Sequence, residues 1–310
     1  MPNAPTLLAL DSASMYFRAY YGVPESMTAP DGMPVNAVRG FLDAIARLVT
    51  DHRPGQLVAT FDADWRPQFR VELLPQYKAQ RVAEEGGEEV PDTLSPQVPV
   101  IQAVLDAIGI TRCEVEGFEA DDVLGSLAEQ ADGPVDVVTG DRDLFQLVDD
   151  DRRVRVLYTA KGFAKLETVD ESTVEAKYGV PARHYADFAV LRGDASDGLP
   201  GVRGVGDKSA AALVQQFGSI EHLLASLADP DADVPHRGKL EGAADYLAVA
   251  PQVVRVRRDL ALGLEDQTPA RALSGEVADP RALEVLTVRY GLANSVKRLC
   301  TALASGFVLE

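Results

Sequence analysis

Short apolar runs that alternate with helical patterns limit most narrowly how this chain can fold. Four runs are expected to be buried strands, at residues 6–11, 56–62, 135–141 and 154–159. Helical patterns lie between them at residues 36–51, 95–109 and 119–131. Continuous apolar strands separated by helices are typical of a parallel sheet covered on both faces. We therefore expect an α/β fold with a mostly parallel sheet flanked by helices.

The second half of the chain has a different character, because strand signals stop after about residue 170 and only helices and loops follow. This change predicts a domain boundary near 170–180. No apolar run approaches the roughly 20 residues of a membrane helix, and the N-terminus lacks the basic region of a signal peptide. Two cysteines far apart predict no disulfide framework. We expect a cytoplasmic protein with no membrane contact.

Three of the four expected strands end in aspartate. Asp11 follows the first strand, Asp62 the second, and Asp141 and Asp143 the third. Ligands of open α/β sheets bind beyond the carboxyl ends of the strands, so these side chains would share one edge. A single aspartate there could instead shape a turn or cap a helix. Its recurrence in three strands favours a common site.

Two further acidic groups extend this pattern. Glu119, Asp121 and Asp122 begin a predicted helix, where the helix dipole alone would also favour them. Asp194 and Asp197 lie in a predicted turn, and turn formation is the alternative for that pair. Nine converging carboxylates would repel one another strongly unless cations lay between them. Either these acids stay apart, or they bind at least two hard cations such as Mg²⁺ or Mn²⁺, as nucleases and phosphatases do.

One basic segment contrasts with a chain that is acidic overall, with 48 acidic against 30 basic residues and a net charge of −18. Such acidity argues against nonspecific nucleic-acid binding, which needs Lys and Arg to neutralise phosphates. Residues 65–81, however, carry Arg66, Arg70, Lys78 and Arg81, with Phe69 and Tyr77 between them. This mixture suits single-stranded nucleic acid, although the aromatic residues could equally belong to the core.

A glycine-rich turn at 198–210 precedes another predicted helix. It is not a Walker A loop, because Asp207 separates Gly206 from Lys208, and its glycines do not follow the dinucleotide-binding order. The pattern fits a helical hairpin whose glycines allow close approach of a phosphate, with Arg203 and Lys208 adding charge. Such a hairpin would hold duplex DNA without reading its sequence. An ordinary connection between two helices is the alternative.

Taken in order, several segments resemble the bacterial 5′-nuclease family, which comprises flap endonucleases and the 5′–3′ exonuclease domain of DNA polymerase I. They are LLALDSASMYFRAYY, FDAD, FRVELLPQYKAQR, GFEADD, TGDRDLFQLV and RGDASDGLPGVRGVGDKSA. The resemblance covers nearly the whole chain, least clearly beyond about residue 265, and is to a stand-alone member. It implies a PIN-like nuclease domain at 1–175 with a helical arch at about 65–100. It also implies a helical DNA-binding domain at 176–310, with a helix–three-turn–helix module at about 185–218 and C-terminal helices.

The resemblance further implies roles for individual residues. The implied ligands of a first metal are Asp11, Asp62, Glu119 and Asp121, those of a second are Asp141, Asp143, Asp194 and Asp197, and Asp122 is shared or acts through water. Lys78 and Arg81 would orient the scissile phosphate, with Arg18 beside them. The expected DNA contacts are Arg70, Tyr77, Gly201, Arg203, Gly204, Gly206 and Lys208. The ions would be Mg²⁺ or Mn²⁺, with K⁺ at the helical hairpin.

The implied activity is that of a structure-specific 5′ nuclease, both flap endonuclease and 5′–3′ exonuclease, that leaves 5′-phosphate and 3′-hydroxyl ends. It would act as a monomer in RNA-primer removal and DNA repair, on 5′ flaps, nicked or gapped duplexes and RNA-primed ends, alongside DNA polymerase or ligase. Acidic residues at 84, 85, 88 and 89 stand where relatives often carry basic ones, so the arch would hold a flap weakly or fold on binding. A non-catalytic junction binder and a PIN-type single-stranded RNase are the alternatives.

Overall fold

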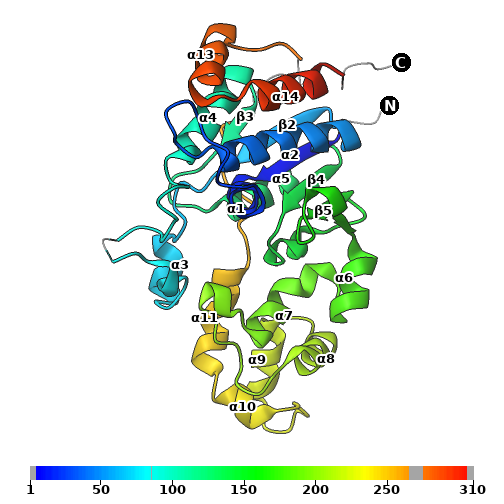
Figure 1. The fold of residues 1–310 in the computed structure, drawn as a ribbon. Coiled ribbons are helices and arrows are strands. Elements are labelled where there is room, and N and C mark those ends of the chain that lie inside the picture. Colours follow the sequence, from blue (N-terminus) through cyan, green and yellow to red (C-terminus); the bar gives the residue numbers. More distant parts are fainter. Residues whose placement is uncertain (1–4, 85, 265–274, 306–310) are drawn as a thin grey trace.

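A six-stranded sheet forms the centre of the nuclease half in the computed structural model, which describes residues 5–84, 86–264 and 275–305 (Figure 1). The strands are β1 (Leu7–Asp11), β2 (Gln56–Thr60), β3 (Thr111–Cys113), β4 (Val135–Thr139), β5 (Val154–Tyr158) and β6 (Glu167–Val169). Their order is β3-β2-β1-β4-β5-β6, and only β6 is antiparallel to its neighbour. The expected α/β class is confirmed. The three-residue strands β3 and β6 were not predicted, because they are too short to give an apolar run.

Helices cover both faces of the sheet, as the alternation of side chains along β1 requires. They are α1 (Ser12–Gly22), α2 (Asn36–His52), α4 (Gln97–Ile108) and α5 (Ala120–Gln130). Leu8 and Leu10 of β1 share a buried cluster with residues of α2 and α4. Leu7 and Ala9 point the other way and share a second cluster with residues of α5. Burial on both faces explains why the strand is apolar throughout.

The helical half follows β6 and lies beyond one end of the sheet (Figure 1). Its helices are α6 (Glu171–Tyr178), α7 (Tyr185–Arg192), α8 (Asp207–Phe217), α9 (Ile220–Ala228), α10 (Arg237–Glu241) and α11 (Ala244–Val254). Helices α7 and α8 flank a series of turns that includes a 3₁₀ turn at Ala195–Asp197. The buried side chains of Val202 and Val205 fix these turns to the helical core. The predicted helical hairpin is therefore present.

The C-terminal helices α13 (Pro280–Tyr290) and α14 (Ala293–Ser305) do not join this helical half, contrary to expectation. Figure 1 shows them at the opposite end of the molecule, where α14 lies against α2 and α13 against α4. Leu292 and Leu299 are buried in the same cluster as the α2 side chains. Apolar side chains of α14 cover α2 and those of α13 cover α4, so the two helices complete the nuclease core rather than a DNA-binding surface.

The segment expected to form a helical arch, residues 65–100, is mostly turn and loop. It contains α3 (Gln68–Leu73), a 3₁₀ turn at Ala79–Arg81 and the start of α4. Prolines at 67, 75, 91 and 96 interrupt any longer helix, because each lacks a backbone N–H and restricts the residue before it. A continuous helical arch is therefore absent from the described part of this segment. Across all the ranges that the structure describes, no helix combines the length and apolarity that a bilayer span needs.

Candidate active site

A cleft of about 490 Å³ lies at the carboxyl ends of β1, β2 and β4, where the sequence places acids. Six of the nine predicted carboxylates line it: Asp11, Asp62, Glu119, Asp121, Asp141 and Asp194. The basic side chains of Lys78, Arg81 and Arg142 line it as well. Acids from separate strands, a helix start and the helical half thus meet in one place, with cations beside them.

Asp11 combines the two roles that the sequence left as alternatives. It caps α1, with Oδ1 accepting a hydrogen bond from the Ser14 N–H at 3.0 Å. Its Oδ2 accepts one from the Thr139 hydroxyl at 2.6 Å. Burial, reinforced by the charges of Asp62 and Asp141, raises the pKa of Asp11 to about 7 despite these hydrogen bonds. A cap of an ordinary surface helix would not be so costly to ionise, so the position is suited to a cation.

The start of α5 brings two further carboxylates to the cleft. Asp62 Oδ1 accepts a hydrogen bond from the Ala120 N–H at 2.7 Å. Glu119 is the N-cap residue of α5, pairs with the Lys78 ammonium and accepts a 2.8 Å hydrogen bond from the Tyr77 hydroxyl. A free N–H group at the start of α5 therefore orients Asp62, while Tyr77 and Lys78, which follow α3, hold Glu119.

The loop after β4 carries Asp141, which lines the cleft, and Asp143. The Asp143 N–H donates to Asp141 Oδ1 at 2.8 Å, while Asp143 Oδ1 is buried and has no hydrogen-bond partner among the described residues. Burial and the nearby Asp141 charge raise the pKa values of Asp143 and Asp121 well above the usual range. A Cβ on Gly140 would lie 2.7 Å from Ser14 Oγ, so only glycine fits between the strand end and α1. These acids need a proton or a cation in place of the missing partners.

The last two carboxylates come from the 3₁₀ turn in the helical half. Asp194 Oδ1 accepts from the Ser196 N–H at 2.9 Å, and Asp197 Oδ1 lies 2.7 Å from an Arg81 nitrogen. The Lys78 N–H donates to the Asp197 carbonyl at 3.0 Å, and Lys78 itself has a left-handed φ of 49°. The segment around Lys78 is thus anchored on the helical half, which presents Asp194 to the cleft.

Asp122, Arg70 and Tyr77 are placed differently from their predicted roles. Asp122 is fully buried, pairs with both terminal nitrogens of Arg70 at 2.7 and 2.8 Å, and accepts from the Arg257 N–H. Arg70 is 2% and Tyr77 5% exposed. Asp122 is buried outside the cleft, which contradicts its predicted contact with a metal, shared or through water. Arg70 and Tyr77 are too deeply buried to touch DNA, which contradicts the DNA contacts predicted for them.

The three glycines of the hairpin differ in what their positions require. Gly201 and Gly204 have φ values of 64° and 78°, and a Cβ on Gly201 would lie 2.6 Å from the Arg192 carbonyl. Gly206 has an ordinary φ of −101° and open space where a Cβ would lie. Arg203 and Lys208 are exposed beside them. The charged residues of the hairpin therefore face solvent, as a contact with DNA would require.

Arg18 lies beside the cleft rather than in its lining. One of its terminal nitrogens would be 3.5 Å from a Cβ on Gly140, and another donates to the Ala160 carbonyl at 3.3 Å. Its Nε is buried and finds no hydrogen-bond partner in the part of the chain that the structure describes. The guanidinium thus supports the loop before Asp141 from below.

The carboxylate oxygens of the cleft are the groups that could bind a metal ion. In the described ranges no three His, Cys, Asp or Glu side chains are grouped so that they could hold an ion as they stand. Basic side chains occupy several of the acids: Lys78 pairs with Glu119, Arg81 with Asp197, and Arg192 with Asp194. The donors are nonetheless all oxygen, crowded and partly unpaired, which is the chemistry that Mg²⁺ and Mn²⁺ prefer. The residues therefore fit hard cations once these ion pairs open.

Sequence reasoning missed several residues of the lining: Phe17, Trp65, Glu88, Arg142 and Tyr158. Glu88 was assigned to an acidic arch, but an antiparallel bridge with Val82 brings it back to the cleft. The adjacent glycines before it, both with positive φ, were a signal for this turn. Arg142 lies between Asp141 and Asp143 in the sequence, and its guanidinium is 3.8 Å from the Asp194 carboxylate.

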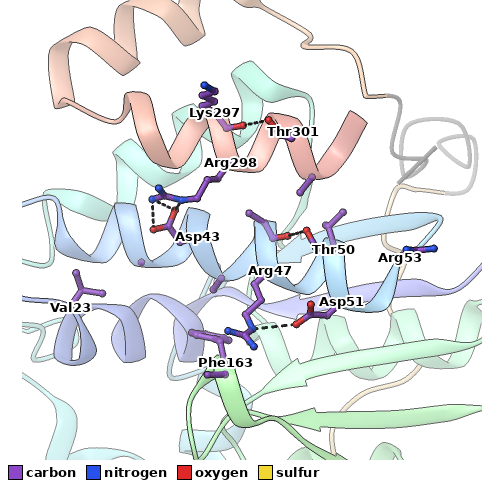
Figure 2. Close-up of a pocket in the computed structure, with 16 residues that line it drawn as sticks. Val23, Asp43, Arg47, Thr50, Asp51, Arg53, Phe163, Lys297, Arg298 and Thr301 are labelled. Carbon is purple, nitrogen blue, oxygen red and sulfur yellow. Dashed lines mark hydrogen bonds and ion pairs between the residues drawn. The ribbon is translucent and has the colours of Figure 1, made fainter. Parts of the chain in front are cut away.

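A larger cavity of about 980 Å³ lies elsewhere, between α2, α14 and the 3₁₀ turn at Phe163–Lys165 (Figure 2). Its two acids are both neutralised by arginines. Asp43 pairs with Arg298 at 2.7 Å, and Asp51 pairs with Arg47 at 3.2 Å. Among the residues that the structure describes, this cavity has neither crowded carboxylates nor unpaired buried groups, so chemistry rather than size identifies the smaller cleft as the candidate site.

Comparison with known proteins agrees with this geometry. A model of the 5′-3′ exonuclease N-terminal resolvase-like domain matches residues 6–179, and a model of the 5′-3′ exonuclease C-terminal SAM fold matches residues 180–274. A 5′-3′ exonuclease of Streptomyces coelicolor is 58% identical over 305 residues, covering 96% of this chain and 100% of that protein. One of Mycobacterium tuberculosis is 49% identical over 312 residues, with 96% and 97% covered.

A solved structure extends the likeness to the fold. The T5 D15 protein, co-crystallised with metal ions, superposes with a TM-score of 0.62 at 16% identity and covers 97% of this chain and 99% of that one. Both halves of the chain match family models, and the sheet, cleft and helical hairpin are all present. The chain belongs to the 5′–3′ exonuclease family.

Proposed function

We propose that the carboxylate cleft is the active site of a metal-dependent, structure-specific 5′ nuclease, acting as both flap endonuclease and 5′–3′ exonuclease on DNA. The observation that carries this proposal is the meeting of six predicted carboxylates and Glu88 with Lys78, Arg81 and Arg142 in one cleft. Membership of the 5′–3′ exonuclease family supports it. The reaction would leave 5′-phosphate and 3′-hydroxyl ends.

Two groups of acids would hold two divalent cations, Mg²⁺ or Mn²⁺. The first group is Asp11, Asp62, Glu119 and Asp121, and the second is Asp141, Asp143, Asp194 and Asp197. Cations bound there supply Lewis acidity toward water and stabilise charge on the attacking and leaving oxygens. The raised pKa values and the unpaired Asp143 oxygen support this assignment, because a cation relieves both.

Lys78 and Arg81 would bind the scissile phosphate. In the present arrangement the ammonium pairs with Glu119 and the guanidinium with Asp197. Both basic groups lie at the cleft and would stabilise the negative charge that builds on a phosphate bound there. The Ser196 carbonyl, which accepts from Arg81 at 2.9 Å, keeps that side chain at the edge of the cleft. Arg18, beneath the loop that carries Asp141, would position the acid rather than touch DNA.

The helical hairpin would hold the duplex part of the substrate, with Arg203 and Lys208 facing the phosphates. A K⁺ ion there would compete with Lys239, whose ammonium donates to the Gly204 carbonyl at 2.8 Å. The substrates would be 5′ flaps, nicked or gapped duplexes and RNA-primed ends, met by a cytoplasmic monomer alongside DNA polymerase or ligase. The nuclease domain would comprise residues 1–175, joined by the C-terminal helices, and the DNA-binding domain would follow.

The first experiment uses a 5′-labelled flap on a nicked duplex, incubated with Mg²⁺, Mn²⁺ or EDTA. We expect metal-dependent release of the flap by the wild type and no release by Asp141→Ala, which should still bind the flap. Asp51→Ala, which removes a carboxylate from the cavity of Figure 2, is the matched control and should cut normally.

Cutting by Asp141→Ala, or by the wild type in EDTA, would contradict the metal assignment. Flap binding without cutting in either metal would instead indicate a non-catalytic junction binder. Preference for single-stranded RNA over flap DNA in competition would indicate an RNase.

A further inference from the structure

We propose that Trp65, the only tryptophan of the chain, is a stacking platform for a nucleobase next to the scissile phosphate. This inference rests on the proposed nuclease function. It assigns a nucleobase-binding site to a residue in the basic, aromatic segment that begins at position 65.

The other two aromatic residues of that segment, Phe69 and Tyr77, are not placed to stack on a nucleobase in the cleft. Phe69 packs on Phe118, with ring centroids 5.7 Å apart. Tyr77 is buried and donates its hydroxyl hydrogen to Glu119. Both rings already have partners and neither lines the cleft, so the stacking predicted for this segment is assigned to the aromatic residue that does line it, Trp65.

Trp65 lies between the metal-binding and phosphate-binding groups. It follows Asp62 by three residues, and its carbonyl accepts a hydrogen bond from the Lys78 ammonium at 3.4 Å. The next residue, Arg66, is held at both ends: its backbone N–H donates to Asp64 Oδ1 at 3.1 Å, and its guanidinium donates to the Tyr77 carbonyl at 2.6 Å and the Pro75 carbonyl at 2.7 Å. Trp65 thus belongs to a segment of the cleft wall that several hydrogen bonds hold in place.

The indole also has an available face. It is partly exposed, and within the ranges that the structure describes it has no hydrogen bond, ring contact or cation–π contact. The other two aromatic residues of the lining already have partners: Phe17 packs on Tyr16 at 5.3 Å, and Tyr158 lies edge-on to Phe145 at 5.1 Å. A flat apolar surface left open beside an ammonium and several carboxylates suits a nucleobase whose phosphate lies at the reacting centre.

The expected effect follows from the strength of base stacking on aromatic side chains. Loss of one such contact should weaken flap binding or slow cleavage roughly 5- to 150-fold. Every base has a stackable face, so the site should tolerate all four bases but not an abasic sugar. Trp65→Phe should retain part of the effect, because a smaller ring still stacks.

The test combines fluorescence with an abasic scan. Wild-type protein is titrated with a labelled 5′ flap in Ca²⁺. Anisotropy reports binding, tryptophan emission reports stacking, and a gel of the same samples reports cleavage. We expect strong quenching of the emission as the flap saturates. Cleavage in Mg²⁺ is then compared for wild type, Trp65→Phe, Trp65→Ala and Tyr290→Ala, a control that removes a ring from α13 at the far end of the molecule, on flaps with one abasic site moved along the strand.

At the stacked position an abasic site should slow the wild type and leave Trp65→Ala no slower than before. Unchanged emission at saturating flap would overturn the proposal. So would a Trp65→Ala penalty that is the same at every abasic position, or one matched by Tyr290→Ala. If the wild type neither binds nor cuts the flap, the proposed function fails instead. Thermal melting of both Trp65 variants guards against misfolding, and Trp65→Phe keeps the test decisive if Trp65→Ala unfolds.

Discussion

Arg70 links three parts of the chain through one buried guanidinium, and its replacement by Met is the sharpest test of what holds the site together. It belongs to α3, pairs with Glu119 and Asp122 at the start of α5, and donates through Nε to the Val253 carbonyl in α11 at 2.9 Å. The side chains of all three charged residues are at most 3% exposed. Met preserves much of the aliphatic volume but supplies no donor.

The magnitude follows from what the two acids retain. Glu119 keeps the Lys78 ammonium and the Tyr77 hydroxyl. Asp122 keeps mainly the Arg257 N–H, at 2.8 Å, for a charge that no water reaches. Breaking a buried ion pair by removing one partner costs about 3–5 kcal/mol, because the remaining charge is left uncompensated. We expect about 3 kcal/mol, the low end, since only one of the two acids loses its cation entirely.

The assay is urea unfolding in EDTA, followed by far-ultraviolet circular dichroism, with Arg47→Met as the matched control. Arg47 also pairs with an aspartate, Asp51 at 3.2 Å, but both side chains are about half exposed (Figure 2). Such a surface pair contributes less than about 1 kcal/mol. If Arg70→Met lowered the free energy of unfolding no more than Arg47→Met does, the buried network would not be what stabilises the start of α5.

Three further predictions concern the cleft and the hairpin. Because the pKa of Asp11 rises from 3.8 to about 7, the folded metal-free protein binds more protons than the unfolded chain between those values. Its stability should therefore fall as pH rises from about 4 to 7, and thermal melts should show Mg²⁺ or Asp11→Asn flattening that decline. Lys78→Ala should slow single-turnover cleavage roughly 10²- to 10³-fold while changing flap affinity little, and a larger effect on affinity would contradict a role at the phosphate. Gly201→Ala, whose Cβ would meet the Arg192 carbonyl, should lower the melting temperature, whereas Gly206→Ala should leave it unchanged. Equal melting of the two glycine variants would refute the packing argument.

Local patterns made the strand ends predictable from the sequence. Asp11, Asp62 and Asp141 follow apolar runs, and parallel pairing brings such ends to one edge regardless of the rest of the fold. Glu119 and Asp194 could be predicted for a related reason, since a helix start and a turn both orient short acidic side chains. The expected α/β order depends on the same periodicity, which is why it is confirmed.

Long-range packing decided the features that sequence reasoning missed. Nothing local distinguishes Asp122, which pairs with Arg70, from Asp121, which faces the cleft one residue earlier. The α-helical period turns adjacent residues about 100° apart, so one points into the core and the other out of it. The position of α13 and α14 likewise depends on which apolar faces of the nuclease half other elements leave uncovered, and those faces belong to α4 and α2.

The pairing of charges within the cleft explains how a chain with a net charge of −18 can hold basic side chains at a site proposed to bind DNA. Lys78, Arg81 and Arg192 each lie against a carboxylate of the candidate site, so their charges are held in place without attracting nucleic acid at a distance. If divalent metal ions occupy the proposed sites, these basic side chains would lose their present carboxylate partners and become available to a phosphate. Strong binding of a phosphate would then require metal ions in the site. The acidity of the chain would thus favour selective binding of substrate rather than oppose binding of DNA.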